Sequence, residues 1–226
     1  LEIRFMTAKD EDTLTSPSLL QKGIALDRLL SDVVLNNKIN PKALLPCDRN
    51  ALLIAARITG YGNLYETDWT CPSCGAQNQG SFDVGNHEVD FPDQEKLDSL
   101  GVRSEDGIYK FDIEGLGVEI GIKLLSYEEE AAVSDAARRR IEIGLTENIT
   151  TDTLKAIIVS VNGVDDSRII NHVVDQMPVK DSRKIRKINS LITPRLKLEG
   201  EVTCAKCSET TVLEVPFTTG FFWPEL

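Results

Sequence analysis

Apolar residues return every three or four positions in several stretches of the chain, which is the spacing of one face of an α-helix. Capping residues such as serine and aspartate precede most of these stretches, and glycine or proline follows them. Residues 51–56 are apolar nearly all round, which places their helix at the centre of the core. We expect Arg49 and Arg57 beside this run to form ion pairs. The predicted helices cover residues 18–36, 48–59, 126–144, 151–158, 165–176 and 181–192.

Alternation of apolar and polar residues predicts β-strands elsewhere in the chain. The alternation is found at residues 1–5, on both sides of each Cys-x-x-Cys pair, and in residues 107–114 and 118–125, which a glycine-containing turn joins. Short amphipathic helices combined with separate β-hairpins indicate an α+β fold. We expect an N-terminal part of strand and helices (1–66), a β-rich part made of two segments (67–125 and 195–226) and a helical insertion (126–194).

Composition narrows the class of protein. The chain has 226 residues, of which 41% are hydrophobic and 27% charged, close to the average of soluble globular proteins. No apolar run approaches the roughly 20 residues of a membrane-spanning helix, so we expect no segment to cross a bilayer. The formal net charge of −11 repels phosphate backbones and disfavours nucleic-acid binding. The chain begins with Leu1 rather than Met, which leaves room for a natural start further upstream.

Four of the five cysteines form two Cys-x-x-Cys pairs, Cys71 with Cys74 and Cys204 with Cys207. Two such pairs are the ligand set of a tetrahedral structural zinc site. Because strand-like residues flank both pairs, we expect each pair at the tip of a β-hairpin, and two hairpins joined by one ion form a zinc-ribbon-like site. The fifth cysteine, Cys47, is interpreted as a small, partly buried apolar residue.

The two cysteine pairs lie unusually far apart in the chain. Between Cys74 and Cys204 there are 129 residues. Closing a loop of that length costs roughly 4 kcal/mol in chain entropy. Structural zinc contributes an apparent ~10–16 kcal/mol in small peptides, which exceeds that cost. The intervening residues are therefore predicted to be a folded insertion whose two ends the ion holds together.

Other uses of the four cysteines stay open from the residues alone. An iron–sulfur cluster takes the same four thiolates, and a Cys-x-x-Cys pair can act as a redox dithiol. Catalytic zinc requires an open coordination position, which four cysteines do not leave. The sequence contains no Ser-His-Asp set, phosphate loop or zinc-protease motif, and His87 and His172 are interpreted as structural. We therefore expect no enzymatic activity.

Aromatic residues gather at the end of the chain. Four of its thirteen phenylalanine, tyrosine and tryptophan residues lie among the last ten positions. An apolar tail of this kind either folds back on the core or docks into a partner. We expect Phe221, Phe222 and Trp223 to bind a partner protein, with packing against the chain's own core as the alternative.

Several blocks of the sequence, in order, resemble those of the T4-type bacteriophage baseplate protein family. The resemblance covers essentially the whole chain. The second knuckle departs from the family pattern, because Ser208 follows Cys207 where glycine is usual, and serine tolerates a left-handed turn less well. The blocks that carry the resemblance are the opening residues 5–12, the arginine-flanked helix with its Tyr-Gly end (48–62), Cys-Pro-Ser-Cys-Gly (71–75), Val-Asn-Gly (161–163), Asp-Ser-Arg (181–183), the second Cys-x-x-Cys and Phe-Phe-Trp-Pro (221–224).

The resemblance implies a structural role in the baseplate hub of a contractile phage tail. Its partners would be other baseplate, hub and tail proteins, and several copies would enter the assembly. The protein would reside in the virion tail, and in the host cytoplasm during assembly. One alternative is a transient hub-assembly chaperone that is absent from the virion. Two others, from different classes, are a zinc-ribbon module that binds nucleic acid and a dithiol oxidoreductase.

Overall fold

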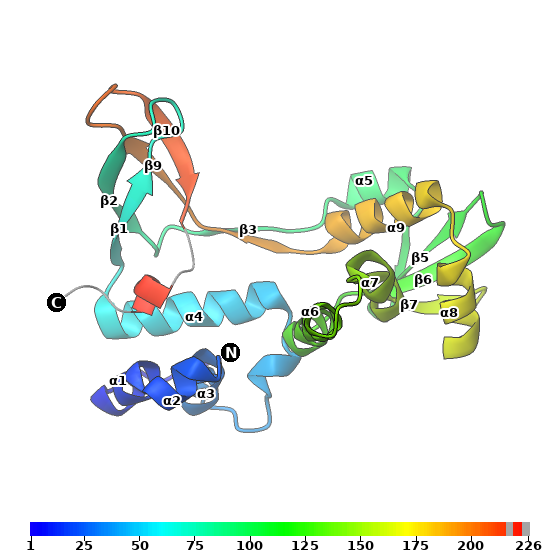
Figure 1. The fold of residues 1–226 in the computed structure, drawn as a ribbon, viewed down its shortest axis with the longest axis horizontal. Helices are drawn as coiled ribbons and strands as arrows, with labels where there is room; N and C mark the ends of the chain where they lie inside the picture. Colours follow the sequence, from blue (N-terminus) through cyan, green and yellow to red (C-terminus); the bar gives the residue numbers. More distant parts are fainter. Residues whose placement is uncertain (216–218, 223–226) are drawn as a thin grey trace. The chain divides into compact units, whose positions relative to one another are not determined.

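The computed structural model describes residues 1–215 and 219–222. The chain forms two compact units (Figure 1). The first contains Leu1–Pro41, Cys47–Asp90 and Arg195–Leu226, and the second contains Lys42–Pro46 and Phe91–Pro194. The chain therefore leaves the first unit briefly at residues 42–46 and again after residue 90, and it returns at residue 195. No helix in the described residues is long and apolar enough to span a bilayer.

The first unit begins with short helices, α1 (Ala8–Thr15), α2 (Pro17–Gln21) and α3 (Ala25–Val33). The single helix expected over residues 18–36 is wrong, because Gly23 adopts φ +68° and breaks it into α2 and α3. The opening strand is also wrong as an extended element. Residues 1–5 contribute an isolated antiparallel bridge between Ile3 and Val34, since no further strand lies beside them to continue a sheet.

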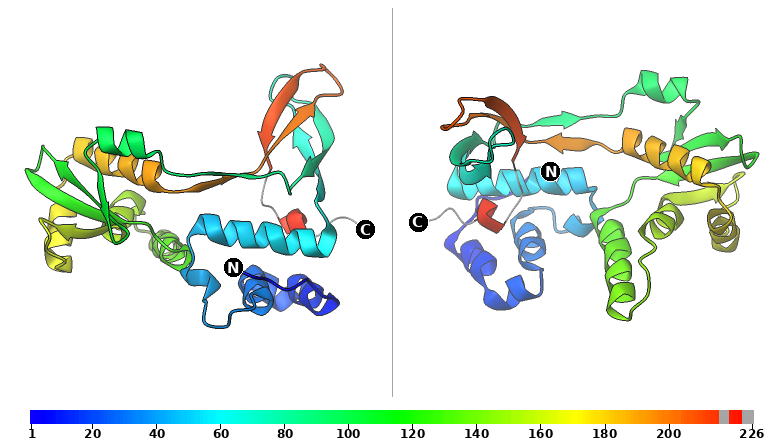
Figure 2. Two further views of the ribbon diagram at one scale, coloured as in Figure 1. Left: turned by 180° about the vertical axis from the view of Figure 1, so that it is seen from behind. Right: turned by 45° about the horizontal axis from the view of Figure 1, so that its top comes forward.

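Helix α4 (Pro46–Tyr61) forms the centre of the first unit, as its apolar sequence predicts. Its buried residues include Leu52, Leu53 and Ile54 as well as both flanking arginines. Arg49 pairs with Asp27 at 2.6 Å, which confirms the expected ion pair. The 3-10 helix η2 (Thr219–Phe222) lies beside α4 in each view of the molecule (Figures 1 and 2).

Two antiparallel hairpins complete the first unit. Strand β1 (Leu64–Thr70) pairs with β2 (Gln77–Asp83), and β9 (Glu199–Thr203) pairs with β10 (Thr210–Glu214). A third ladder pairs β3 (Glu88–Asp90) with β8 (Arg195–Lys197). These two short strands are the outgoing and returning chain at the edge of the first unit (Figure 2). The ladder therefore holds the ends of the insertion side by side.

The second unit is built on an antiparallel sheet with the strand order β4-β5-β6-β7. Its core joins the sheet residues Phe111, Ile120 and Ile122 to Ile185 and Ile188 of the last helix. The hairpin expected at residues 107–114 and 118–125 is confirmed as β5 and β6. The elements of this unit are α5 (Gln94–Ser99), β4 (Arg103–Glu105), β5 (Ile108–Ile113), β6 (Val118–Lys123), α6 (Tyr127–Glu142), α7 (Ile149–Ile157), β7 (Ile158–Val161), α8 (Ser167–Asp175) and α9 (Val179–Ile192); the 3-10 helix η1 (Pro41–Ala43) lies where the chain passes between the units.

The division of the chain differs from the expected one. The segment 91–125 lies with the helical insertion rather than with the cysteine hairpins, because β5 and β6 supply the sheet against which the helices pack. Strand β7 was not expected. Its four residues form the edge of that sheet beside β6, and a short apolar run directly after a helix cannot be distinguished from more helix by its pattern. The return of the chain at residue 195 agrees with the expectation.

Candidate metal centre

Both Cys-x-x-Cys pairs lie at hairpin tips and have the same backbone geometry. In the first, the amide of Gly75 donates to the carbonyl of Cys71 at 2.9 Å, and the amide of Cys71 donates to the carbonyl of Ala76 at 2.8 Å. In the second, the amide of Ser208 donates to the carbonyl of Cys204 at 2.9 Å, and the amide of Cys204 donates to the carbonyl of Glu209 at 2.9 Å. Equivalent turns hold the two pairs of sulfur atoms in equivalent positions, as the repeated spacing indicates.

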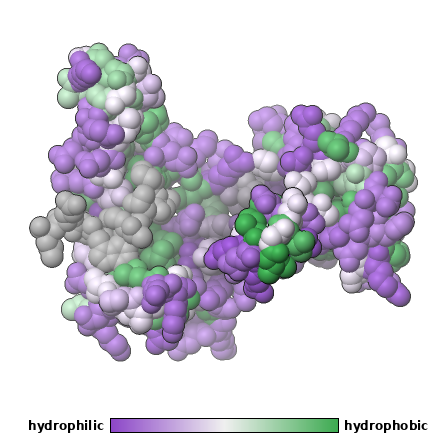
Figure 3. Space-filling model, in the orientation of Figure 1, coloured by the Kyte–Doolittle hydropathy of each residue, from purple (hydrophilic) through white to green (hydrophobic). Residues whose placement is uncertain are grey.

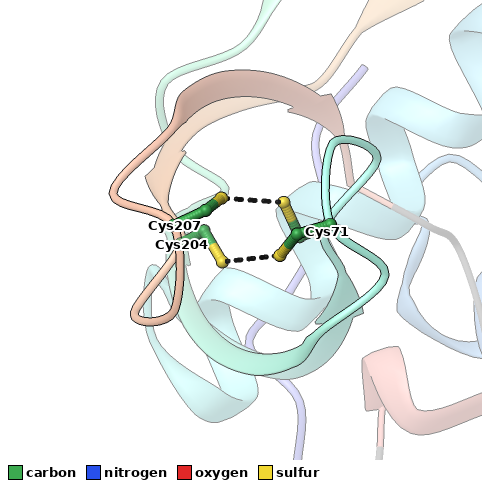
Figure 4. A group of neighbouring side chains, drawn as sticks. Cys71, Cys204 and Cys207 are labelled. Atoms are coloured by element: carbon green, nitrogen blue, oxygen red, sulfur yellow. Dashed lines mark hydrogen bonds between the residues drawn. The ribbon is translucent and has the colours of Figure 1, made fainter.

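The structure brings the four sulfur atoms together. The Sγ atoms of Cys71 and Cys207 are 3.7 Å apart, as are those of Cys74 and Cys204 (Figure 4). All four Sγ atoms lie within 4.8 Å of one another. A tetrahedral ion with metal–sulfur bonds of about 2.3 Å requires sulfur–sulfur distances of about 3.8 Å, whereas a disulfide requires about 2.05 Å. The spacing fits four ligands around one ion and does not fit disulfide bonds.

The protein protects one side of this cluster more than the other. Cys71 and Cys204 are each 1% exposed, whereas Cys74 is half-buried and Cys207 is exposed. Trp69 lies on β1, two positions before Cys71, and its side chain is buried. The cluster is thus a partly shielded site at the hairpin tips, which an ion can reach from solvent.

The sulfur atoms differ in their tendency to ionise. The backbone amides of Cys207 and Lys206 donate toward the Cys204 sulfur and lower the pKa of this thiol to about 6. The amide of Ala76 lowers the pKa of the Cys74 thiol, but desolvation and hydrogen bonds with the other thiols outweigh it and raise this pKa to about 12. A divalent cation would remove this difference between the thiols, because it favours the thiolate form of every sulfur that binds it.

Asn78 on β2 connects the two knuckles. Its Oδ1 accepts a hydrogen bond from the backbone amide of Ala205 at 2.9 Å. Its Nδ2 donates to the carbonyl of Ala76 at 3.0 Å and to the sulfur of Cys204 at 3.6 Å. Groups that hydrogen-bond to metal ligands fix the ligands' orientation. This role was not predicted from the sequence, because the partners Cys204 and Ala205 lie more than a hundred positions away and no local pattern marks Asn78.

Ser208 occupies the turn position that the first knuckle fills with Gly75. The φ angle is +57° at Ser208 and +69° at Gly75. Both values lie in the left-handed region, which glycine adopts without the steric cost of a Cβ atom. The left-handed turn expected at this position is therefore present, with serine where the first knuckle has glycine.

The aromatic residues near the end of the chain are buried rather than exposed. Phe221 and Phe222 are 1% and 2% exposed, so their side chains pack in this chain's own core and present no surface to a partner. The expected partner-binding role is corrected for these two residues. Trp223 lies outside the described residues.

Arg57 holds this segment in place. Its guanidinium donates to three carbonyl oxygens, those of Phe221 at 2.7 Å, Gly62 at 2.6 Å and Leu64 at 2.8 Å. It also lies 5.2 Å from the ring centroids of Tyr65 and Phe221. The ion pair expected for Arg57 is wrong. The buried guanidinium instead donates to backbone carbonyl oxygens at the end of α4, at the start of β1 and in η2.

Comparison with known protein families decides the assignment. The model of the family described as T4 bacteriophage base plate protein matches residues 1–223. The chain belongs to this family. A search of the curated proteins and a search of the solved structures gave no match.

In this baseplate protein the candidate metal site consists of cysteines alone, without histidine or acidic side chains. Within residues 1–215 and 219–222, it is the one group of three or more histidine, cysteine or acidic side chains placed to hold an ion. His87 instead hydrogen-bonds to the carbonyl of Val84 at 3.2 Å, in keeping with the structural role expected for it.

Proposed function

We propose that this protein is a structural component of the phage tail baseplate hub, without enzymatic activity, and that a single structural zinc ion fastens its two cysteine hairpins. The family match over residues 1–223 supports the baseplate assignment. The convergence of four sulfur atoms from hairpins 129 residues apart supports the zinc site. The protein works through contacts with other hub and tail proteins in the virion, after assembly in the host cytoplasm.

The proposed ion acts as a clamp. Four thiolates fill a tetrahedral zinc ion and leave no position for a substrate or water. Cys71, Cys74, Cys204 and Cys207 would hold it, and the β3–β8 ladder continues the junction away from the knuckles. Sulfur atoms 3.7 Å apart favour one ion over a multi-iron cluster, which spreads its thiolates around a larger body. Zinc gives a colourless protein, whereas an oxidised iron–sulfur centre absorbs visible light.

The surface of the second unit supports a role in protein–protein contacts. Residues 141–150, where α6 ends and α7 begins, are all exposed. Four large apolar side chains lie in this connection, Ile141 (55% exposed), Ile143 (72%), Leu145 (55%) and Ile149 (53%). Figure 3 shows apolar surface in green on the facing side of the second unit. A cluster of exposed apolar side chains on a monomer is typical of a docking site.

Mass spectrometry of purified virions tests the hub assignment. A component gives peptides of this chain in a fixed ratio to other baseplate proteins. A transient assembly chaperone, the second candidate, gives peptides in infected-cell extracts and none in virions. The family match supports both, and the chaperone alternative becomes the conclusion if virions lack the chain.

A gel-shift experiment separates the zinc-ribbon nucleic-acid module from the proposed role. With a formal charge of −11, the protein is expected to shift neither duplex nor single-stranded DNA at low salt. A shift that disappears after chelation of the metal would favour the nucleic-acid module instead. The oxidoreductase alternative predicts reduction of insulin disulfides, which a fully liganded zinc site does not support.

A further inference from the structure

Helix α9 carries a basic face that the rest of its own unit does not neutralise. Its residues Ile185, Ile188 and Ile192 are buried in the core of the second unit. On the opposite side lie the exposed residues Lys180, Arg183, Arg186 and Lys187, here called the basic face. Their spacing of three or four positions places them on one side of the helix. Among the residues of the second unit (Lys42–Pro46 and Phe91–Pro194), none of these four side chains forms an ion pair.

The stability of α9 does not explain this basic face. Cations stabilise a helix near its C-terminus, where the helix dipole is negative. Helix α6 follows this rule, with glutamates in its first turn and Arg139 and Arg140 in its last. In α9, by contrast, Lys180 and Arg183 lie in the N-terminal half and the last turn contains no basic residue. Lys180 therefore lies at the unfavourable end of the dipole, and the other three basic residues gain nothing from it, so helix stability does not account for the basic face.

The hairpin β9–β10 carries an equally unneutralised acidic face. Glu199, Glu201 and Glu214 are exposed on one side of it, here called the acidic face. Glu199 lies directly opposite Glu214 across the ladder, and Glu201 lies opposite Val212, which is 59% exposed. Like charges directly opposite one another destabilise a hairpin. Among the described residues of the first unit, none of the three glutamates has a cationic partner.

We propose that the basic face of α9 binds the acidic face of β9–β10 of a second copy of this chain. The two faces are opposite in charge, and each is locally unfavourable until a partner covers it. Their charges are also similarly spaced, about 5–6 Å between neighbouring helix positions and about 7 Å between alternate strand residues. A second copy is favoured over nucleic acid because the chain itself supplies the complementary face, while its net charge of −11 repels polyanions.

This contact joins two different surfaces, so every copy keeps one free basic face and one free acidic face. Such heterologous contacts continue into closed rings or open chains rather than stopping at a symmetric dimer. The inference goes beyond the proposed hub role, and no cysteine takes part in the contact, although β9–β10 is one of the two hairpins that the proposed ion fastens. Because the attraction is between exposed charges, association is expected to weaken strongly as salt rises.

Sedimentation velocity on the full chain tests this proposal. The wild type is expected to form oligomers at about 50 mM salt and to dissociate at about 500 mM, where charges are screened within a few ångströms. The variant R183E/K187E reverses the basic face, and E199K/E201K reverses the acidic face. Each alone is expected to stay monomeric. An equimolar mixture of the two is expected to associate, because every contact between unlike variants again joins opposite charges.

A matched control is R138E/R139E, which changes the net charge by the same amount at the end of α6, away from the basic face. It is expected to associate like the wild type. Circular dichroism checks that all variants are folded. A wild type that is monomeric at low salt, or two reversed variants that fail to associate when mixed, overturns the proposal. Binding of a 20-base-pair DNA duplex that is lost in R183E/K187E also overturns it, since the basic face then serves nucleic acid. None of these outcomes alters the hub or zinc proposals.

Discussion

Ser208 shows how one residue departs from the turn geometry that its knuckle requires. Its φ of +57° lies in the same left-handed region as the +69° of Gly75 in the first knuckle. The backbone turn is otherwise the same in both knuckles, so the difference between them is one Cβ atom and a hydroxyl group. The cost of that Cβ can be measured directly by exchanging the residue.

Ser208→Gly is expected to stabilise the folded protein by about 1 kcal/mol. It removes the steric cost of a Cβ atom in the left-handed region, and this cost is larger than the extra backbone entropy of glycine in the unfolded chain. Chemical denaturation with the metal bound measures the free energy of unfolding. The reverse exchange, Gly75→Ser in the first knuckle, serves as the matched control and should cost a similar amount. A destabilised Ser208→Gly variant would show that the hydroxyl, rather than the backbone, matters at this turn.

Asp10 is a buried carboxylate whose charge is held by its neighbours. Arg4 donates to its two oxygens at 2.6 and 2.7 Å, and the amide and hydroxyl of Thr7 each donate to it at 2.8 Å. The Arg4 guanidinium, together with Thr7, holds the pKa of this carboxyl well below its usual range. Since the pKa is lower in the folded state than in the unfolded state, the pair stabilises the fold above about pH 4.

The pH dependence of stability checks this pair. As pH falls below about 5, the unfolded chain takes up the proton first, and the stabilisation by Asp10 is progressively lost. Asp10→Asn is expected to cost about 1–3 kcal/mol at neutral pH and to flatten the loss of stability between about pH 5 and pH 2. Denaturation of both proteins over that range provides the measurement. Parallel pH profiles would show that other carboxylates dominate the acid response.

At the scale of elements, Arg57 joins α4, the start of β1 and the C-terminal helix η2. It binds the carbonyls of Gly62, Leu64 and Phe221, and it is 1% exposed. A planar guanidinium can reach three separate acceptors at once, whereas a lysine ammonium is a point charge on a flexible stem. Arg57 therefore helps to attach η2 to α4 and β1, together with the buried rings of Phe221 and Phe222.

Arg57→Lys is expected to destabilise the protein by about 2 kcal/mol or more, since buried carbonyls lose their donors. Limited proteolysis should then cleave the C-terminal segment earlier than in the wild type. Arg28→Lys is a suitable control, because the Arg28 side chain is 64% exposed and its ion pair with Asp32 lies on the surface. Equal stability and equal proteolysis for both variants would contradict the attachment proposed for Arg57.

Local signals predicted single elements well and their distant contacts poorly. The expected helix at residues 126–144 is found at Tyr127–Glu142, because its start depends on the nearby Ser126 and Glu129, which form a capping box. The knuckles were likewise predictable from cysteine spacing. Strand β7, the carbonyl partners of Arg57 and the bridge made by Asn78 depend on residues far away in the sequence, which a single chain does not reveal.

At the scale of the whole molecule, the chain is a first unit interrupted by a second. The insertion runs from residue 91 to residue 194, and its ends meet at the β3–β8 ladder. The cysteine hairpins flank that ladder on the same unit. The sequence predicted an insertion from the distance between the cysteine pairs, but it placed the first boundary too late, since β5 and β6 resembled the hairpins in pattern and belong to the other core.

We propose that the four sulfur atoms bind one ion and that this ion holds the fold together. Elemental analysis combined with X-ray absorption of the purified protein tests it most directly. We predict one zinc per chain with four sulfur ligands at about 2.3 Å, and a Cys71→Ser variant that binds no zinc and is destabilised by several kcal/mol. A folded wild-type protein that contains no stoichiometric metal, or a metal with fewer than four sulfur ligands, would contradict the account.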